Sequence, residues 1–139
     1  SCTGNAATVT GLTLNGSTIG IAHADWDFSV DGGAVTTITP AVTSTIPDNA
    51  VMIDVMFNTL VTPTSGGATT ISVGIANNAT TTIKNALARA SWGAPDTLIT
   101  TSNLPAKTTA AGAITFTINT NAATAGKIEC WVKYYVAAG

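Results

Sequence analysis

The residues best suited to chemistry are the carboxylates of the segment Asp25–Asp31, where oxygen-bearing side chains occupy every second position. This spacing superficially resembles the calcium-binding loop of EF-hand proteins. That loop needs glycine at its sixth position and glutamate at its twelfth, where this sequence has Val30 and Thr36. Large apolar residues alternate with the acids, which is typical of a strand. The sequence therefore predicts solvated carboxylates on an exposed strand face, and no bound metal.

Other catalytic or cofactor-binding patterns are incomplete. His23 is the only histidine, so the sequence offers neither a pair of histidine ligands nor a Cys/His metal cluster. A Ser–His–Asp triad would lack the Gly-x-Ser-x-Gly turn that holds its nucleophile. Among seven acidic residues, spacing nominates no pair of glycosidase carboxylates. The loop Ser65–Gly67 lacks the lysine and helix of a phosphate-binding loop. We therefore expect no enzymatic activity and no cofactor.

Three tryptophans and an adjacent pair of tyrosines could form a contact surface. They could be a platform on which a sugar stacks, or they could lie in the core and at contacts between subunits. Aromatic residues on the outward face of a strand often mark subunit contacts, which favours the second interpretation. We assign Trp26 to the core. The candidate interface residues are Trp92, Trp131, Tyr135 and Cys2.

Charged residues are scarce: the 139 residues include five Lys or Arg and seven Asp or Glu, for a net charge of −2. The basic residues are too scattered to neutralise several phosphates, so nucleic acid is not an expected partner. No apolar run reaches the roughly eighteen residues of a membrane helix, and no signal peptide opens the chain. We therefore expect synthesis and assembly in a cytoplasm. Weak charge repulsion suits an assembled protein better than a free monomer.

The two cysteines, Cys2 and Cys130, stand near opposite ends of the chain. Chain termini often lie close together, so a disulfide between them is geometrically possible. Alternatively both remain thiols, Cys130 as a small buried residue of a strand and Cys2 in a mobile terminus. Cytoplasmic synthesis favours the two free thiols.

The longest apolar segment, residues 46–76, is the expected centre of the core. Its first strand, 51–61, alternates with period two, and Asp54 and Asn58 fall on the outward face. A Gly/Pro/Ser-rich loop at 62–68 leads to a second strand at 69–76, which is typical of a β-hairpin with a wide loop. The residues expected to point inward from the first strand are Val51, Ile53, Val55, Phe57 and Val61.

Shorter elements precede this hairpin. Residues 1–7 are expected to form a flexible arm, followed by a first strand at Thr8–Leu14. A strand at Ala24–Val30 should turn at Asp31–Gly33 and form a hairpin with residues 35–38. The residues that this strand should bury are Trp26, Phe28 and Val30.

The second half contains one expected helix and two strong strands. The segment Ile83–Ala90 carries apolar residues at helical spacing, which predicts a short helix. Residues 96–111 are expected on the surface, and strands are expected at 113–118 and 127–136. Seven or eight short strands separated by Gly/Pro/Asn turns indicate one all-β domain over residues 8–139, an antiparallel β-sandwich in jelly-roll form with one short helix.

Several turn and strand signals resemble a broad group of tailed-bacteriophage virion proteins. They are a turn into a long apolar strand, a Gly-Gly loop into a Ser-Val-Gly strand, and a closing Thr-Ala-Gly-Lys turn before an aromatic strand, and the resemblance covers about residues 24–136. It implies a head decoration (cement) protein, a β-sandwich trimer that binds the major capsid protein on the virion surface and has no catalytic residues. The segments that carry it are Ile46–Val51, Ser65–Ala68, Ile71–Ile75, Thr124–Ile128 and Tyr134–Val136.

Two alternatives stay open on the sequence. One is a phage tail, fibre or baseplate component, or a receptor- or glycan-binding module, in which Trp92 or Trp131 would contact host glycan. Binding on a glycan array that is lost in Trp92→Ala would favour it. The other is a secreted carbohydrate-binding or pilin-like subunit, which a disulfide between Cys2 and Cys130 would favour.

Overall fold

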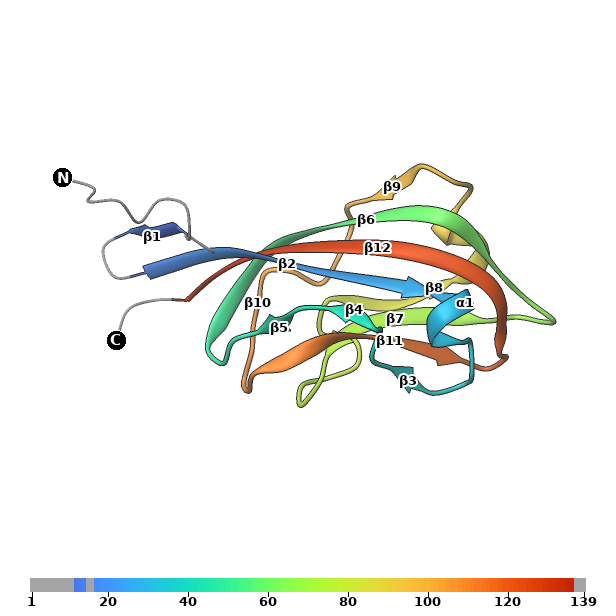
Figure 1. Cartoon of the computed structure of the whole chain (residues 1–139), viewed down its shortest axis with the longest axis horizontal. Coiled ribbons are helices and arrows are strands. Elements are labelled where there is room, and N and C mark those ends of the chain that lie inside the picture. Colours follow the sequence, from blue (N-terminus) through green and yellow to red (C-terminus); the bar gives the residue numbers. More distant parts are fainter. Residues whose placement is uncertain (1–11, 15–16, 137–139) are drawn as a thin grey trace.

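The computed structural model describes residues 12–14 and 17–136. In this part of the chain two antiparallel β-sheets pack face to face, and the polypeptide passes repeatedly from one sheet to the other (Figure 1). One short α-helix, α1 (Phe28–Asp31), and one 3-10 helix, η2 (Arg89–Trp92), complete the described elements. The predicted all-β sandwich with one short helix is confirmed. Neither described helix has the length and apolar character needed to cross a membrane.

The larger sheet has seven strands, with β12 at its centre between β2 and β6. Along the outer edge of β2 the short strands β1 and β4 pair at successive positions, and β9 and β10 do the same along β6. The strands of this sheet are β1 (Leu12–Leu14), β2 (Ser17–Asp27), β4 (Val42–Thr43), β6 (Ala50–Ser65), β9 (Thr97–Ile99), β10 (Ala106–Lys107) and β12 (Ala123–Val136).

The smaller sheet has five strands in the order β3-β11-β7-β8, and β5 pairs with one end of β11. Its strands are β3 (Thr37–Ile38), β5 (Thr45–Ile46), β7 (Thr70–Ile75), β8 (Lys84–Ala88) and β11 (Gly112–Asn119). Eight strands can be numbered one to eight in chain order: β2, β3, β6, β7, β8, β10, β11 and β12. In this numbering the neighbouring strands of the larger sheet follow the order 1-8-3-6, and those of the smaller sheet follow the order 2-7-4-5. This is the strand order of a jelly roll, as predicted.

Aromatic pairs join the two sheets, and the larger sheet and η2, in the core. The rings of Trp26 and Phe116 lie 6.5 Å apart between centroids, and Phe57 meets Trp92 edge to face at 5.2 Å. The indole of Trp26 also donates a hydrogen bond of 2.9 Å to the carbonyl oxygen of Gly32, which holds the turn after α1 against the core. Full burial of one such side chain contributes roughly 1.5–3 kcal/mol. The two predicted closing strands are confirmed as β11 and β12, which bury Ile114, Phe116, Ile118, Ile128, Cys130 and Val132.

The predicted central hairpin is wrong in its pairing. Strands β6 and β7 follow one another in the sequence, but β6 pairs with β12 while β7 pairs with β11 and β8. The loop at 66–69 therefore carries the chain from the larger sheet to the smaller. Both strands bury apolar side chains, from opposite sides of the same core, so their alternation is the same as it would be in a hairpin.

The predicted inward residues of β6 are only partly correct, because the pairing of β6 with β12 is irregular at several positions. Val55 and Phe57 are buried as predicted, whereas Ile53 and Val61 are exposed. The pairing with β12 skips one residue at Ile53 and another at Leu60. Each extra residue moves the side chains beyond it to the opposite face of the sheet, as β-bulges do.

The strand predicted at Ala24–Val30 ends three residues early. Asp27 caps α1, because its carboxylate accepts hydrogen bonds from the backbone N–H of Ser29 at 3.0 Å and its hydroxyl at 2.7 Å. Phe28 still packs against the core, but Val30 is 66% exposed, contrary to the prediction. The chain then enters β3, which pairs with β11 rather than with β2, so the second predicted hairpin is also wrong.

The helix predicted at Ile83–Ala90 is wrong as well. The segment forms β8, which pairs with β7, and the chain coils only at η2. Ile83 is buried and Leu87 packs against the core. Residues four apart share a face of a strand as well as a face of a helix, so their spacing fits both structures. Because the segment forms hydrogen bonds with β7, it adopts the strand rather than the helix.

Several predictions concern residues that the structure does not describe. The flexible arm at 1–7, the start of the first strand and the domain division at residue 8 stay predictions. Cys2 also lies outside the described residues, so its pairing with Cys130 is untested. Cys130 lies in the middle of β12 and is fully buried, and burial raises the pKa of its thiol well above the usual range. It therefore packs as a small neutral side chain.

Two glycines provide a test of how tightly the sheets fit. A Cβ atom added at Gly112 would overlap the backbone carbonyl oxygen of Ala76, whereas one added at Gly66 would meet nothing within 4 Å. We expect Gly112→Ala to lower the free energy of unfolding by roughly 2–3 kcal/mol, and Gly66→Ala to change it by less than about 1 kcal/mol. Urea denaturation measures both values. Equal stability of the two variants would contradict the packing described here.

Candidate functional site

The outward side chains of β2, β12 and β6 form a continuous surface, called the open face below. Strand pairing places these side chains in cross-strand rows: Trp131 lies between His23 and Met56, and Lys133 lies between Ile21 and Asp54. Side chains opposite one another in such rows lie close enough to interact. The open face consists of Ile21, His23, Asp25, Asp54, Met56, Asn58, Glu129, Trp131 and Lys133.

Exposed apolar side chains concentrate on the larger sheet. Of the nine large hydrophobic residues that are exposed in the described chain, seven belong to its strands. On the smaller sheet, by contrast, the outward-facing Ser72 and Thr115 are 3% and 2% exposed, and the loop at 79–80 lies against Gly74. The larger sheet therefore offers the free apolar surface. The seven are Ile21, Val42, Ile53, Met56, Val61, Leu98 and Trp131.

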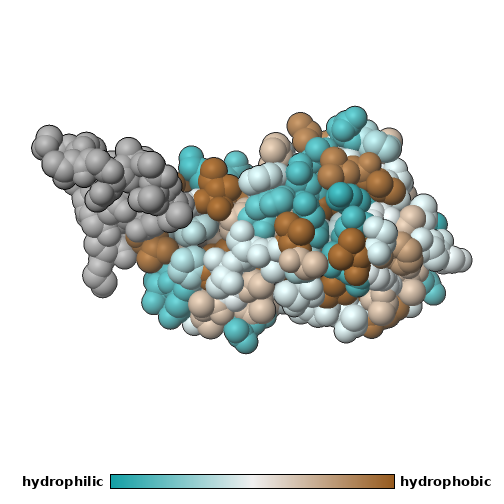
Figure 2. Space-filling model, in the orientation of Figure 1, coloured by the Kyte–Doolittle hydropathy of each residue, from teal (hydrophilic) through white to brown (hydrophobic). Residues whose placement is uncertain are grey.

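These side chains are interspersed with polar ones. Figure 2 shows the visible surface as a mosaic in which small hydrophobic groups are separated by hydrophilic residues. On the open face a shallow hollow lies between Ile21, Met56 and Trp131, with Lys133 at its side. Such a surface can be buried against a partner that supplies both apolar and polar contacts.

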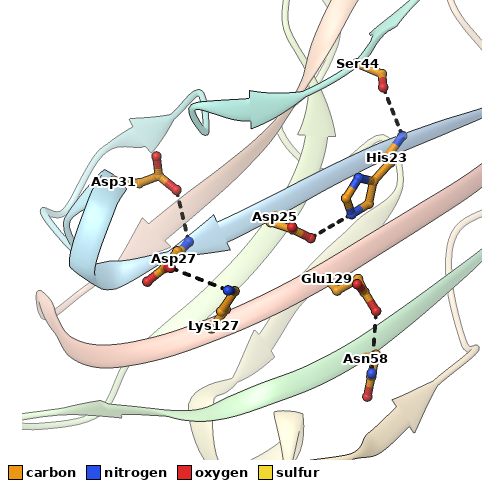
Figure 3. A network of polar contacts seen from close by, with 8 residues as sticks. All are labelled: His23, Asp25, Asp27, Asp31, Ser44, Asn58, Lys127 and Glu129. Atoms are coloured by element: carbon orange, nitrogen blue, oxygen red, sulfur yellow. Dashed lines mark hydrogen bonds and ion pairs between the residues drawn. The ribbon is translucent and has the colours of Figure 1, made fainter.

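The side chains at the centre of the open face hold one another in place. The imidazole of His23 stacks on the indole of Trp131 at 3.9 Å between ring centroids, with 16° between the planes. Its Nε2 atom lies 2.7 Å from Oδ1 of Asp25 (Figure 3). Asp25 is paired across the strands with Glu129, and the Nδ2 atom of Asn58 lies 3.5 Å from Oε1 of Glu129. His23, Asp25 and Glu129 each offer one atom that could bind a metal ion, and these three atoms lie within 4.8 Å of one another.

A second polar group lies at the end of β2. The hydrogen bonds from Ser29 are the main reason that the pKa of Asp27 falls below its usual value of 3.8, and Lys127, with Nζ 3.6 Å from Oδ2, adds to the effect. Asp31 accepts hydrogen bonds from the backbone N–H groups of Asp27 at 3.0 Å and Ala41 at 2.8 Å (Figure 3). The acids of the calcium-like segment thus cap backbone groups and pair with neighbouring side chains.

The candidate interface residues from the sequence do not lie together. Trp92 is fully buried beside Phe57, so the structure places it in the core, away from any surface ligand. Trp131 is 38% exposed at the centre of the open face, and Tyr135 is half-buried further along β12. Cys2 is outside the described residues. An interface role for Trp131 and Tyr135 therefore stays a proposal.

Sequence reasoning missed the group of His23, Asp25 and Glu129. Because His23 and Asp25 are two residues apart in a strand, the sequence places both on one face. Glu129 lies more than a hundred positions later, and only the pairing of β2 with β12 brings it to the same place. The available signal was the alternation of the last strand, in which Glu129, Trp131 and Lys133 share its outward face.

Comparison with known proteins identifies the fold. No protein-family model matches the sequence, and no curated protein matches it. Among solved structures, a chain of the cyanophage Pam1 capsid asymmetric unit aligns with a TM-score of 0.62 and 19% identity, over 98% of this chain and 99% of that chain. A chain of the acidic stable capsid of Helicobacter pylori bacteriophage KHP30 gives 0.62 and 16% identity, over 86% and 89%. A chain of the Ralstonia phage GP4 capsid gives 0.53 and 14% identity, over 96% and 94%. The chain thus shares its fold with chains of three phage capsids.

Replacing each of two tryptophans tests the distinction between core and open face. We expect Trp92→Ala to lower the free energy of unfolding by about 3–5 kcal/mol, because it opens a cavity beside Phe57. Trp131→Ala should cost about 1 kcal/mol, mainly through the lost stacking on His23. Urea denaturation followed by far-UV circular dichroism checks both values. A larger loss for Trp131→Ala than for Trp92→Ala would reverse the two assignments.

The cap formed by Asp27 predicts a loss of stability in acid. Its pKa is lower in the folded chain than the usual 3.8, so its contribution is present above that value and disappears as pH falls through the folded pKa. We expect the Tm of Asp27→Asn to fall less steeply with decreasing pH below about pH 4 than the Tm of the unmodified chain. Asp48→Asn, at an exposed carboxylate before β6, is the control and should keep the original acid dependence. Identical pH profiles for all three proteins would exclude the Asp27 contribution.

Proposed function

We propose that the chain is a non-enzymatic capsid decoration (cement) protein that binds the major capsid protein and stabilises the head of a tailed bacteriophage. The observation that carries this proposal is the end-to-end likeness to a chain of the cyanophage Pam1 capsid, which covers 98% of this chain and 99% of that one. The alignment therefore runs over nearly the whole of both chains rather than over a fragment of the fold.

The distribution of apolar surface supports a binding role and indicates the surface used. Seven exposed apolar side chains lie on the larger sheet, whereas the outward-facing Ser72 and Thr115 at the middle of the smaller sheet are buried. Burial of apolar area drives most protein association, and each square ångström contributes roughly 25 cal/mol. The open face also carries Asp25, Asp54, Glu129 and Lys133, so a partner must pair these charges or leave them in water. We assign the open face as the surface that binds the shell.

The proposed mechanism is mechanical. Trimers of this chain, bound at the surface of the virion, would span junctions between capsid subunits and bury additional surface at each junction. Subunits that separate under the pressure of the packaged genome would then have to break these contacts as well. A rigid sandwich suits this task because its sheets transmit force through continuous hydrogen bonding between strands.

The glycan-binding alternative loses one of its two candidate residues. Trp92 is buried in the core, so loss of binding in Trp92→Ala would report unfolding rather than a lost sugar contact. Trp131 is accessible, but His23 already covers one face of its indole at 3.9 Å. The alternative of a secreted, disulfide-bridged subunit rests on Cys2 and stays untested.

The proposal is tested with DNA-filled phage heads that lack this chain and to which the purified chain is added back. We expect the added chain to saturate a fixed number of sites per particle and to raise the temperature at which capsids release their DNA. Light scattering of the free chain beforehand gives its mass, for which a trimer is expected. Failure to bind, or capsids that retain DNA equally well without the chain, would refute the function. If the free chain has the mass of a monomer, trimers would form only on the assembled shell.

Two matched variants test the binding surface. Ile21, at 67% exposure, lies on the open face, and Val30, at 66% exposure, lies on α1 outside it. We expect Ile21→Asp to lower the number of chains bound per capsid at least about tenfold, while Val30→Asp binds as the unmodified chain does. Densitometry of purified particles measures both. The reverse pattern would place the contact at α1.

A further inference from the structure

We propose that His23, Asp25 and Glu129 form a binding site for a divalent transition-metal ion such as Zn²⁺ on the open face. The three side chains offer one imidazole nitrogen and two carboxylate oxygens, and one ligand atom from each lies within 4.8 Å of the other two. This combination of nitrogen and oxygen ligands is the kind that holds zinc with three protein groups and leaves a fourth position for water. The proposal does not depend on the proposed function.

The strands hold the three ligands in place. His23 and Asp25 project from the same side of β2, two residues apart, and β12 presents Glu129 directly opposite Asp25. Nε2 of His23 and Oδ1 of Asp25 are 2.7 Å apart. Two ligands bound at about 2.0–2.1 Å to one ion stand roughly 3 Å apart or slightly more, so small side-chain rotations suffice to admit the ion. The sheet thus needs no rearrangement.

Contacts with the ring restrict the orientation of the imidazole. The indole of Trp131 lies against one side of the ring at 3.9 Å, and Oδ1 of Asp25 lies 2.7 Å from its Nε2 atom. Supporting contacts of this kind reduce the freedom that a ligand must lose when it binds a metal. The other two ligands are half-buried, which limits their competition with bulk water.

The charge of the site requires a positive partner. Asp25 and Glu129 face each other across the strands, and two like charges in such a pair destabilise a sheet. In the described chain no lysine or arginine forms an ion pair with either of them, and the nearest such pair joins Lys127 to Asp27. A divalent cation between the two carboxylates would remove the repulsion.

The neighbouring amide of Asn58 lies beside Glu129. Among the described residues its buried Oδ1 atom has no hydrogen-bond partner, and its Nδ2 atom lies 3.5 Å from Oε1 of Glu129. Buried polar atoms are rarely left without a partner. The oxygen and nitrogen of an amide have nearly the same shape, so a half-turn of the group would bring Oδ1 towards Glu129 and place Nδ2 in the buried position. In that orientation Oδ1 can bind the ion directly or through its water.

Isothermal titration calorimetry with ZnCl₂ on the folded chain without a histidine tag tests the site. We expect one Zn²⁺ per chain and a rise in Tm of roughly 5 °C at saturating zinc. Because His23 is the only histidine, its imidazole signals in an NMR spectrum report directly on the nitrogen ligand. They should shift with Zn²⁺ and stay in place with Ca²⁺, which prefers oxygen ligands. Absence of zinc binding, or binding that leaves the imidazole signals unchanged, would overturn the proposal.

Three near-isosteric variants assign the carboxylates. We expect Asp25→Asn and Glu129→Gln each to weaken zinc binding at least about tenfold. Asp54→Asn removes one negative charge from the same open face outside the site and should leave the affinity unchanged. If the first two bind zinc as tightly as the unmodified chain, a lone surface histidine explains the binding and the three-ligand site is wrong. Circular dichroism of each variant verifies that the sandwich is retained.

Discussion

The position of β12 between β2 and β6 is the constraint on which the rest of the structure depends. The strand hydrogen-bonds on both sides along most of its length, from Lys127 to Val136 on the β2 side. Because its residues alternate between two faces, each pairing partner contributes to the core and to the open face at once. A shift of one residue would exchange Ile128, Cys130 and Val132 with Glu129, Trp131 and Lys133. The apolar interior therefore specifies which side chains meet on the surface.

Sequence reasoning succeeded where one strand decided the outcome alone. Alternation identified the buried faces of β11 and β12 and the burial of Trp26, because period two requires only local geometry. It failed where pairing mattered. The glycine-rich loop after β6 has the composition of a hairpin turn, yet it joins two sheets. The spacing of Ile83 and Leu87 fits a helix as well as the extended segment that leads into β8 and forms it. The extra residues in β6 have no local signature, so the exposure of Ile53 was not predictable.

The surface was harder to predict than the fold. Composition gave no means of separating Trp92, which is buried between Ser91 and Gly93, from Trp131, which is exposed between Cys130 and Val132. The group of His23, Asp25 and Glu129 was missed because its members come from strands far apart in the chain, although each residue type was visible. Low charge suggested a contact surface, and the fold adds that most of the exposed large apolar side chains lie on the larger sheet.

The central place of β12 also affects how the chain is made. β2 and β6 leave the ribosome first, and about sixty residues separate the end of β6 from the start of β12. At roughly 5–20 residues per second, β6 waits about 3–12 s for the neighbour that it shares with β2, and β2, which is made earlier, waits longer. During this interval their N–H and C=O groups are open to other chains. Among copies made close together, β12 of one nascent chain can complete the sheet of another, so a high local density of nascent chains favours strand-exchanged assemblies.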